Sequence, residues 1–212
     1  MRWMTTVVVA VVVVGAAAPL AAQQPQQQPG SALAPPKTFT SIFATGYTDA
    51  GALKNGENSW NLGSGVGIGA SMQRQLKQGL TIGLEGTYVP SVGMEVSHPG
   101  AGGSAVTEKG NGSISTAMAT GRISTGGGGG VGLYLAGGAG LVGYSMPALA
   151  GLNSRFETDF GFRTSAGLEY QFSRRNHLFL EWGKIWALHP GTGVDKQTNK
   201  FTQLRGGMRI GW

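Results

Sequence analysis

In residues 156–172, mostly apolar side chains alternate with charged, polar or glycine residues from one position to the next. The mostly apolar set has aromatic residues toward both ends: Phe156, Thr158, Phe160, Phe162, Thr164, Ala166, Leu168, Tyr170 and Phe172. The other set is charged, polar or glycine, and a period of two indicates a β-strand between different surroundings. A strand of a soluble sandwich also alternates. Aromatic residues at both ends of the apolar face, however, are typical of a strand that crosses a membrane.

Similar alternation recurs along the chain. Phe39, Phe43 and Tyr47 mark a first strand, and further strands are predicted in residues 60–72, 80–88, 113–124, 131–145, 178–186 and 201–212. In 60–72 we expect Trp60, Leu62, Ser64, Val66, Ile68, Ala70 and Met72 to share one face, opposite a row of glycines. In 178–186, Lys184 is an exception on the apolar side. Residues 113–124 and 131–145 alternate poorly, so their faces stay unassigned.

The breaks between these segments alternate in length. Short breaks fall at 73–79, 125–130 and 173–176, and longer ones near 49–58, 90–110, 147–155 and 189–199. Eight strands with both chain ends on the short-turn side predict an all-β, antiparallel, up-and-down transmembrane barrel. Closure leaves no unpaired strand edge, which lipid could not satisfy. The rival, a soluble lipocalin-like barrel, requires an apolar interior and a polar exterior.

Composition fits one β-rich domain. The chain has 212 residues, 38 glycines and no cysteine, which excludes disulfide frameworks and thiolate zinc sites. The formal charge of +6 comes from scattered basic residues, so we expect no nucleic-acid partner.

The first residues form a targeting segment. Arg2, the apolar run 7–14 and small residues up to Ala22 are typical of a secretory signal peptide over 1–22, with an uncleaved membrane anchor as the alternative. Residues 23–36, rich in glutamine and proline, predict a linker. The barrel then occupies 37–212.

With these features the chain resembles the small OmpA/OmpX-type outer-membrane β-barrel proteins over residues 37–212. The resemblance implies an integral protein of the cell outer membrane, with outer-membrane lipid and lipopolysaccharide as partners. It also implies that the last segment carries a signal read by the outer-membrane assembly machinery, formed by Leu204, Met208, Ile210 and Trp212. We expect a monomer with a structural or surface-interaction role.

Charged residues divide by expected location. The short turns carry basic residues and no acidic ones: Lys37, Arg74, Lys77, Arg122, Arg174 and Arg175. This basic rim is predicted to contact anionic phospholipid headgroups on the periplasmic side, the alternative being solvated turn charges. The strand positions that face the lumen carry Glu85, Arg163, Glu169, Glu181, Arg205 and Arg209.

Two carboxylates inside a narrow barrel would repel each other unless arginines neutralised them. We therefore predict a network of Glu169, Glu181, Arg205 and Arg209 that plugs the lumen. An eight-stranded barrel has barely enough interior for its side chains, which favours a plug. The alternative is a narrow channel for small solutes or apolar molecules.

Few residues suggest catalysis. The glycines of 63–69 recur every second residue within a strand, which favours inner-wall spacing over a phosphate-binding loop. His98 and His189 are expected in outer loops and His177 at a periplasmic turn, without the spacing of a metal site. Some outer-membrane barrels modify lipid A with a serine and a histidine, but no strand has a His-x-Ser pair. We expect no enzyme activity, metal or cofactor, and a surface partner for loop 90–110 stays open.

Overall fold

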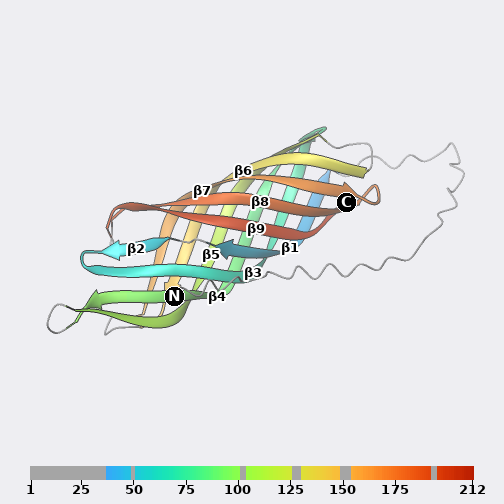
Figure 1. The fold of residues 1–212 in the computed structure, drawn as a ribbon. Helices are drawn as coiled ribbons and strands as arrows, with labels where there is room; N and C mark the ends of the chain where they lie inside the picture. Colours follow the sequence, from blue (N-terminus) through green and yellow to red (C-terminus); the bar gives the residue numbers. More distant parts are fainter. Residues whose placement is uncertain (1–36, 49–50, 101–103, 126–129, 149–153, 192–194) are drawn as a thin grey trace, which may run out of the picture. The chain divides into compact units, whose positions relative to one another are not determined.

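The computed structural model describes residues 37–48, 51–100, 104–125, 130–148, 154–191 and 195–212 (Figure 1). The predicted signal peptide (1–22) and linker (23–36) lie outside the described residues. No helix in the described part is long and apolar enough to cross a membrane.

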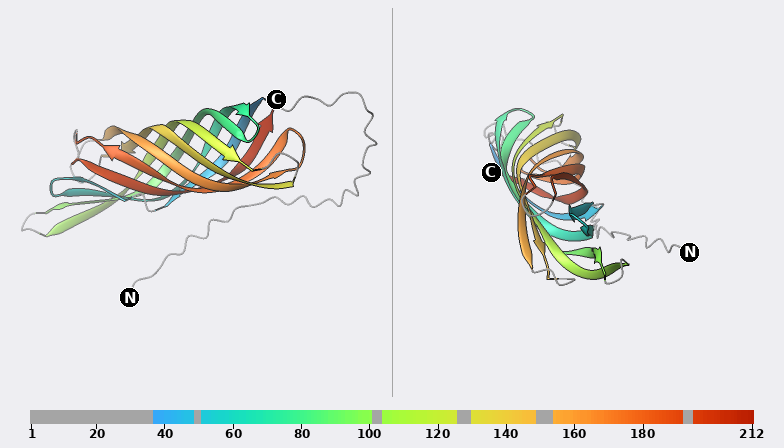
Figure 2. Two further views of the ribbon diagram at one scale, coloured as in Figure 1. Left: turned by 90° about the horizontal axis from the view of Figure 1, so that it is seen from above. Right: turned by 90° about the vertical axis from the view of Figure 1, so that its left-hand side faces the viewer.

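The described part contains nine antiparallel β-strands. They are β1 Thr38–Thr48, β2 Ala52–Asn55, β3 Asn58–Lys77, β4 Leu80–Pro99, β5 Ala105–Ser124, β6 Gly130–Met146, β7 Arg155–Gln171, β8 Asn176–His189 and β9 Gln197–Gly211. Eight of them close a ring, because β1 pairs with β9 on one side and with β3 on the other (Figure 2). The short strand β2 adds to β3 beyond the end of β1. The predicted eight-stranded up-and-down barrel is therefore confirmed.

The start of β1 and the end of β9 lie side by side at the short-turn end of the barrel. Thr38 N donates to Trp212 O at 3.3 Å, and Trp212 N donates to Thr38 O at 2.9 Å. The turn between β3 and β4 is only Gln78 and Gly79, and Gly79 has a φ of 75°, a conformation that favours glycine. This arrangement matches the predicted placement of the short turns.

The prediction of a long loop over residues 90–110 is wrong. Strand β4 continues to Pro99 and β5 begins at Ala105, so most of this region is a paired hairpin that extends the wall. On its exposed surface Lys109 Nζ lies 2.8 Å from Glu95 Oε1. The hydrogen bond and the negative charge of Glu95 raise the pKa of Lys109. The glycine, serine and proline content suggested a loop here, but β4 and β5 pair with each other through this region.

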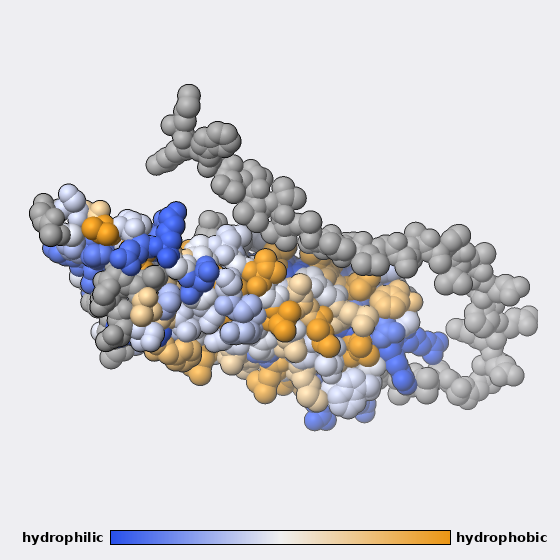
Figure 3. Space-filling view, turned by 90° about the horizontal axis from the view of Figure 1, so that it is seen from below, coloured by the Kyte–Doolittle hydropathy of each residue, from blue (hydrophilic) through white to orange (hydrophobic). Residues whose placement is uncertain are grey.

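The outer wall of the barrel is apolar. Large hydrophobic side chains on it are highly exposed, including Ile68 at 69%, Leu84 at 69% and Val131 at 74%. Figure 3 shows apolar side chains along the wall and hydrophilic ones toward the ends. Charged side chains such as Glu85 and Arg205 are buried inside, at 6% and 4% exposure. This polarity is the reverse of a lipocalin-like barrel.

Strand β3 does not keep one face throughout, so the prediction for residues 60–72 is partly wrong. Trp60 and Leu62 are buried inside, whereas Val66 and Ile68 are exposed on the outer wall. The register against β4 shifts between Leu62 and Gly65, where β3 carries one extra residue. One extra residue reverses the alternation of every side chain beyond it.

The two faces left unassigned by sequence are clear in the structure. On β5, Ile123 is exposed outside and Met118 is buried inside. On β6, Leu133 and Leu135 are exposed outside, and Tyr134 is buried inside.

On the inner face of β3, a glycine lies where the ring of Phe43 from β1 packs against the strand. A Cβ on Gly69 would lie only 2.3 Å from the ring of Phe43. Gly69 therefore leaves room for an inward aromatic ring, as predicted, and the segment is part of a continuous strand. Gly63, which was predicted on the same inner face, is exposed instead, because it lies at the register shift.

Candidate functional site

The interior of the barrel holds a buried layer of charged side chains. Its members are Glu85, Arg122, Arg163, Glu169, His177, Glu181, Arg205 and Arg209, none more than 8% exposed. They come from β4, β5, β7, β8 and β9, where the period of two turns every second side chain inward. This set, here called the charged layer, forms two groups of ion pairs.

Glu85 is the centre of the first group. Its Oε1 pairs with Arg163 and lies 2.5 Å from Arg205 Nη1. Arg205 also pairs with Glu181 and lies over the ring of Phe43, with its guanidinium carbon 4.7 Å from the ring centre. Glu85 on β4 thus joins β7 and β9 across the lumen, and Arg205 extends the connection to β8.

Glu169 is the centre of the second group. Its Oε2 lies 2.5 Å from Arg122 Nη2, 3.3 Å from His177 Nδ1 and 3.5 Å from Arg209 Nη1. The Arg122 guanidinium stacks over Tyr134 at 3.5 Å, and that of Arg209 over Phe39 at 3.8 Å. Each guanidinium in this group therefore has both a carboxylate and an aromatic face as a neighbour.

The structure divides the network expected from sequence. Glu169 and Arg209 belong to one group, and Glu181 and Arg205 to the other. A single cluster was predicted because β7, β8 and β9 are neighbouring strands. The ion pair of Glu85 on β4 with Arg163 on β7 crosses the lumen, and the order of the strands alone does not reveal it.

Two residues placed at the short turns by sequence belong to this interior. The assignment of Arg122 to the basic rim is wrong, because its side chain is 5% exposed and pairs with Glu169. His177 begins β8 next to a turn, yet its side chain also points inward. Proximity to a turn in sequence did not reveal which way either side chain points.

Next to the charged layer, on the side of the longer connections, lies a layer of hydroxyl and amide groups. Tyr47 Oη lies 2.7 Å from Thr87 Oγ1, which lies 2.7 Å from Thr116 Oγ1. Gln203 Nε2 donates to Thr45 Oγ1 at 3.0 Å and to Tyr47 Oη at 3.3 Å. These hydrogen bonds link the four strands β1, β4, β5 and β9, and they satisfy buried polar groups that water does not reach.

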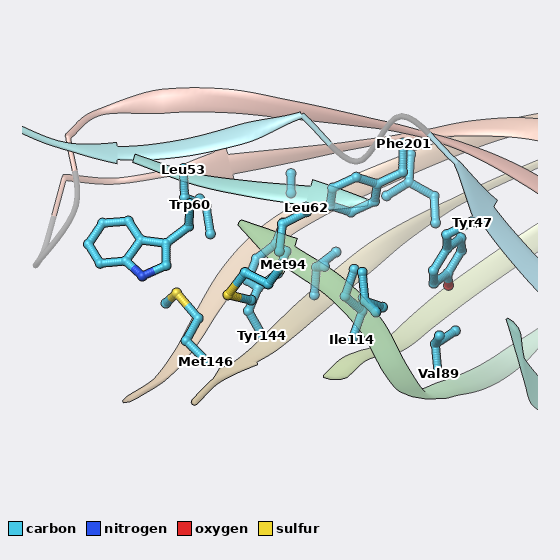
Figure 4. Close-up of a cluster of buried hydrophobic side chains, with 14 of the residues drawn as sticks. Tyr47, Leu53, Trp60, Leu62, Val89, Met94, Ile114, Tyr144, Met146 and Phe201 are labelled. Carbon is cyan, nitrogen blue, oxygen red and sulfur yellow. The ribbon is translucent and has the colours of Figure 1, made fainter. Parts of the chain in front are cut away.

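The half of the interior toward the longer connections is mostly apolar. Its buried cluster, here called the apolar layer, comprises Tyr47, Leu53, Trp60, Leu62, Val89, Val92, Met94, Val96, Ile114, Met118, Val142, Tyr144, Met146, Ile185, Ala187 and Phe201. Figure 4 shows most of these side chains, directed from several strands toward the middle of the barrel. The ring of Phe201 lies 6.1 Å from that of Tyr47 and 5.9 Å from that of Tyr144.

Sequence reasoning missed the apolar layer. The inward alternation of Val92, Met94 and Val96 was a usable signal, but it lies in the region assigned to a loop. Trp60 and Leu62 were assigned to the outer wall because the extra residue in β3 has no sequence signature.

A buried Asp–His pair lies in the same half. His189 Nδ1 is hydrogen-bonded to Asp159 Oδ1, and the two residues are 2% and 1% exposed. The prediction that His189 lies in an outer loop is wrong, because it is the last residue of β8 and points inward. His98 lies on β4, and the described residues contain no group of three or more side chains suited to a metal.

The other predicted site residues lie on the outer surface. Five of the six basic-rim residues are exposed near the short-turn end: Lys37, Arg74, Lys77, Arg174 and Arg175. The expected assembly-signal residues lie on the outer wall, at exposures of 37% for Leu204, 40% for Met208, 39% for Ile210 and 61% for Trp212.

The interior is closed by side chains. Tyr47, Val89 and Phe201 have no accessible surface, so no water-sized passage runs beside them. The charged layer, whose side chains are at most 8% exposed, fills the lumen at a second level.

No protein-family model matches the sequence, and no curated protein matches it. Solved structures match the fold at low sequence identity. Neisserial surface protein A has a TM-score of 0.54 and 15% identity, over 82% of this chain and 97% of that chain. The outer membrane protein OprG of Pseudomonas aeruginosa has a TM-score of 0.55 and 12% identity, over 84% of this chain and 96% of that chain. The chain therefore has the fold of the small outer-membrane β-barrels.

Proposed function

We propose that the chain is an integral protein of the cell outer membrane with a structural or surface-interaction role. The observation that carries this proposal is the polarity of the barrel, apolar outside and ionic inside. Apolar surface of this extent is unfavourable in water and favourable against lipid acyl chains. In such barrels the short turns face the periplasm and the longer connections face the exterior.

The closed interior favours this role over that of a channel. Solutes would have to displace both the ion pairs of the charged layer and the packed rings of the apolar layer. A path for apolar molecules is opposed by the charged layer, and a path for ions by the apolar layer. The two layers instead suit a barrel whose interior serves stability.

The exterior offers a surface for a partner. The β4–β5 hairpin extends the wall on the side of the longer connections, with β2 and β3 beside it (Figure 1). Its exposed side chains include Glu95, Val106 and Lys109. Loops and hairpins on a rigid scaffold are common sites of recognition.

An enzymatic role is not part of the proposal. Asp159 orients His189 as a catalytic carboxylate would, but Nε2 of His189 has no hydrogen-bond partner in the described part of the chain. A Ser–His–Asp mechanism requires a hydroxyl at that nitrogen. The pair is better understood as a buried polar contact between β7 and β8.

The proposal is tested by cell fractionation and by heat-modifiable gel migration. We expect the protein in the outer-membrane fraction, and faster migration before boiling than after it, because a closed barrel resists detergent at low temperature. Recovery as a soluble periplasmic protein would contradict the proposal.

The basic rim is proposed to contact anionic phospholipid of the periplasmic leaflet. Each well-placed basic side chain contributes about 1 kcal/mol to such contact. Replacing Arg74, Lys77, Arg174 and Arg175 with glutamine is expected to weaken association with phosphatidylglycerol vesicles relative to phosphatidylcholine vesicles. Equal association of the wild type and the variant would contradict this contact.

A further inference from the structure

Lys184 is a cation on the apolar outer wall. It is exposed on β8, on the same face as Trp182 and Trp186, two residues away on either side. Its cross-strand partners are Thr164 on β7 and Thr202 on β9. A lysine within an apolar wall is unfavourable unless its ammonium reaches a polar or anionic region.

A second lysine lies beside it. Lys200 on β9 is exposed and pairs with Trp186, which places it diagonally across from Lys184. Diagonal neighbours on one face of a sheet lie roughly 7–8 Å apart. Neither lysine makes an ion pair with another side chain in the described residues.

Both lysines lie far from the short-turn end. Asn176 at the start of β8 pairs with Ile210 on β9. Lys184 is eight residues beyond this level and Lys200 ten residues beyond it. At a rise of about 3.3 Å per residue and a tilt of about 40°, these positions lie roughly 20 and 25 Å from that end. The apolar band of such barrels is about 25 Å tall, so Lys200 reaches its outer boundary. The flexible stem of Lys184 can carry its ammonium toward the same boundary.

We propose that Lys184 and Lys200 bind a phosphate group of a phosphorylated glycolipid in the outer leaflet. This inference rests on the proposed function and assigns a site to the outer-leaflet lipid. Two ammonium groups at this spacing supply several donors and two positive charges for one phosphate. Thr202 lies on the same face, opposite Lys184 and two residues from Lys200, and Trp182 and Trp186 suit the boundary between headgroup and acyl chains.

The surroundings favour a lipid over a protein or a free anion. Leu188 and Leu204 are exposed beside the lysines, so a ligand here must offer acyl chains next to its phosphate. Anionic phospholipids of the opposite leaflet are out of reach, because their headgroups lie at the short-turn end.

The test uses the refolded chain in phosphatidylcholine vesicles that contain bisphosphorylated lipid A. We expect the variant K184Q/K200Q to retain about tenfold less lipid A than the wild type. The matched control K54Q/K196Q removes the same charge from two exposed lysines on the side of the longer connections and should retain the wild-type amount. The variant K184R/K200R should retain most of it, because the charges remain.

A second arm uses lipid A without its phosphates, for which all variants should be equal. Equal retention of bisphosphorylated lipid A by K184Q/K200Q and the wild type, both inserted and heat-modifiable, overturns the site. Failure of the wild type itself to insert overturns the proposed function instead.

Discussion

Replacing Glu85 with glutamine is expected to lower the free energy of unfolding by roughly 3–5 kcal/mol. Among the described residues, Glu85 is the only carboxylate in ion-pair contact with Arg163, and it is one of two in contact with Arg205. The amide is nearly isosteric but neutral, so the variant leaves a buried guanidinium without a counter-charge. Urea unfolding in lipid vesicles, followed by tryptophan fluorescence, measures the change.

The matched control for this prediction is Glu95→Gln. Its partner Lys109 is 78% exposed and Glu95 itself 49%, so water replaces the lost contact. Exposed ion pairs contribute little to stability, and we expect a nearly unchanged unfolding midpoint. Equal stability of Glu85→Gln and Glu95→Gln would show that the charged layer does not stabilise the barrel.

Much of the fold follows from the period of two. Residues 156–172 predicted a membrane-type strand, and β7 covers nearly all of it. The same period correctly turned Glu85, Glu169 and Arg205 inward, because regular strands alternate without exception. Where a regular strand also alternates clearly between apolar and polar residues, sequence alone identifies the face of each side chain.

The failures in β3 and β4 have a common physical cause, which is local departure from regular pairing. A single extra residue in β3 turned Trp60 and Leu62 inward, and an irregularity between Val89 and Val92 did the same for the next part of β4. Such bulges depend on the partner strand, which no local pattern contains. The apolar layer was missed for this reason.

The ion pairs could be predicted only in part. The arginines and glutamates of neighbouring strands could be placed near each other by register, as with Glu181 and Arg205. The contact between Glu85 on β4 and Arg163 on β7 crosses the lumen, so it depends on the curvature of the closed ring. Strand order gives neighbours along the wall but not partners across it.

The two layers together predict how the barrel could be opened. We expect the wild type to show no steady ion conductance in planar bilayers, because the charged and apolar layers close the lumen in series. The variant E85A/R163A removes an ion pair from the first layer, and Y47A/F201A removes two rings from the second. Each variant alone should stay closed, since the other layer is intact.

The combination of all four substitutions is expected to conduct. In the charged layer three guanidinium groups, of Arg122, Arg205 and Arg209, would then face the carboxylates of Glu169 and Glu181. This excess of positive charge predicts an anion preference, which the reversal potential in a salt gradient measures. Removing Phe201 costs about 3–5 kcal/mol of stability, so heat-modifiable migration must first show that each variant is folded. Conductance by a folded variant with only one layer altered would contradict closure in series, because the intact layer alone should suffice to block the passage of ions.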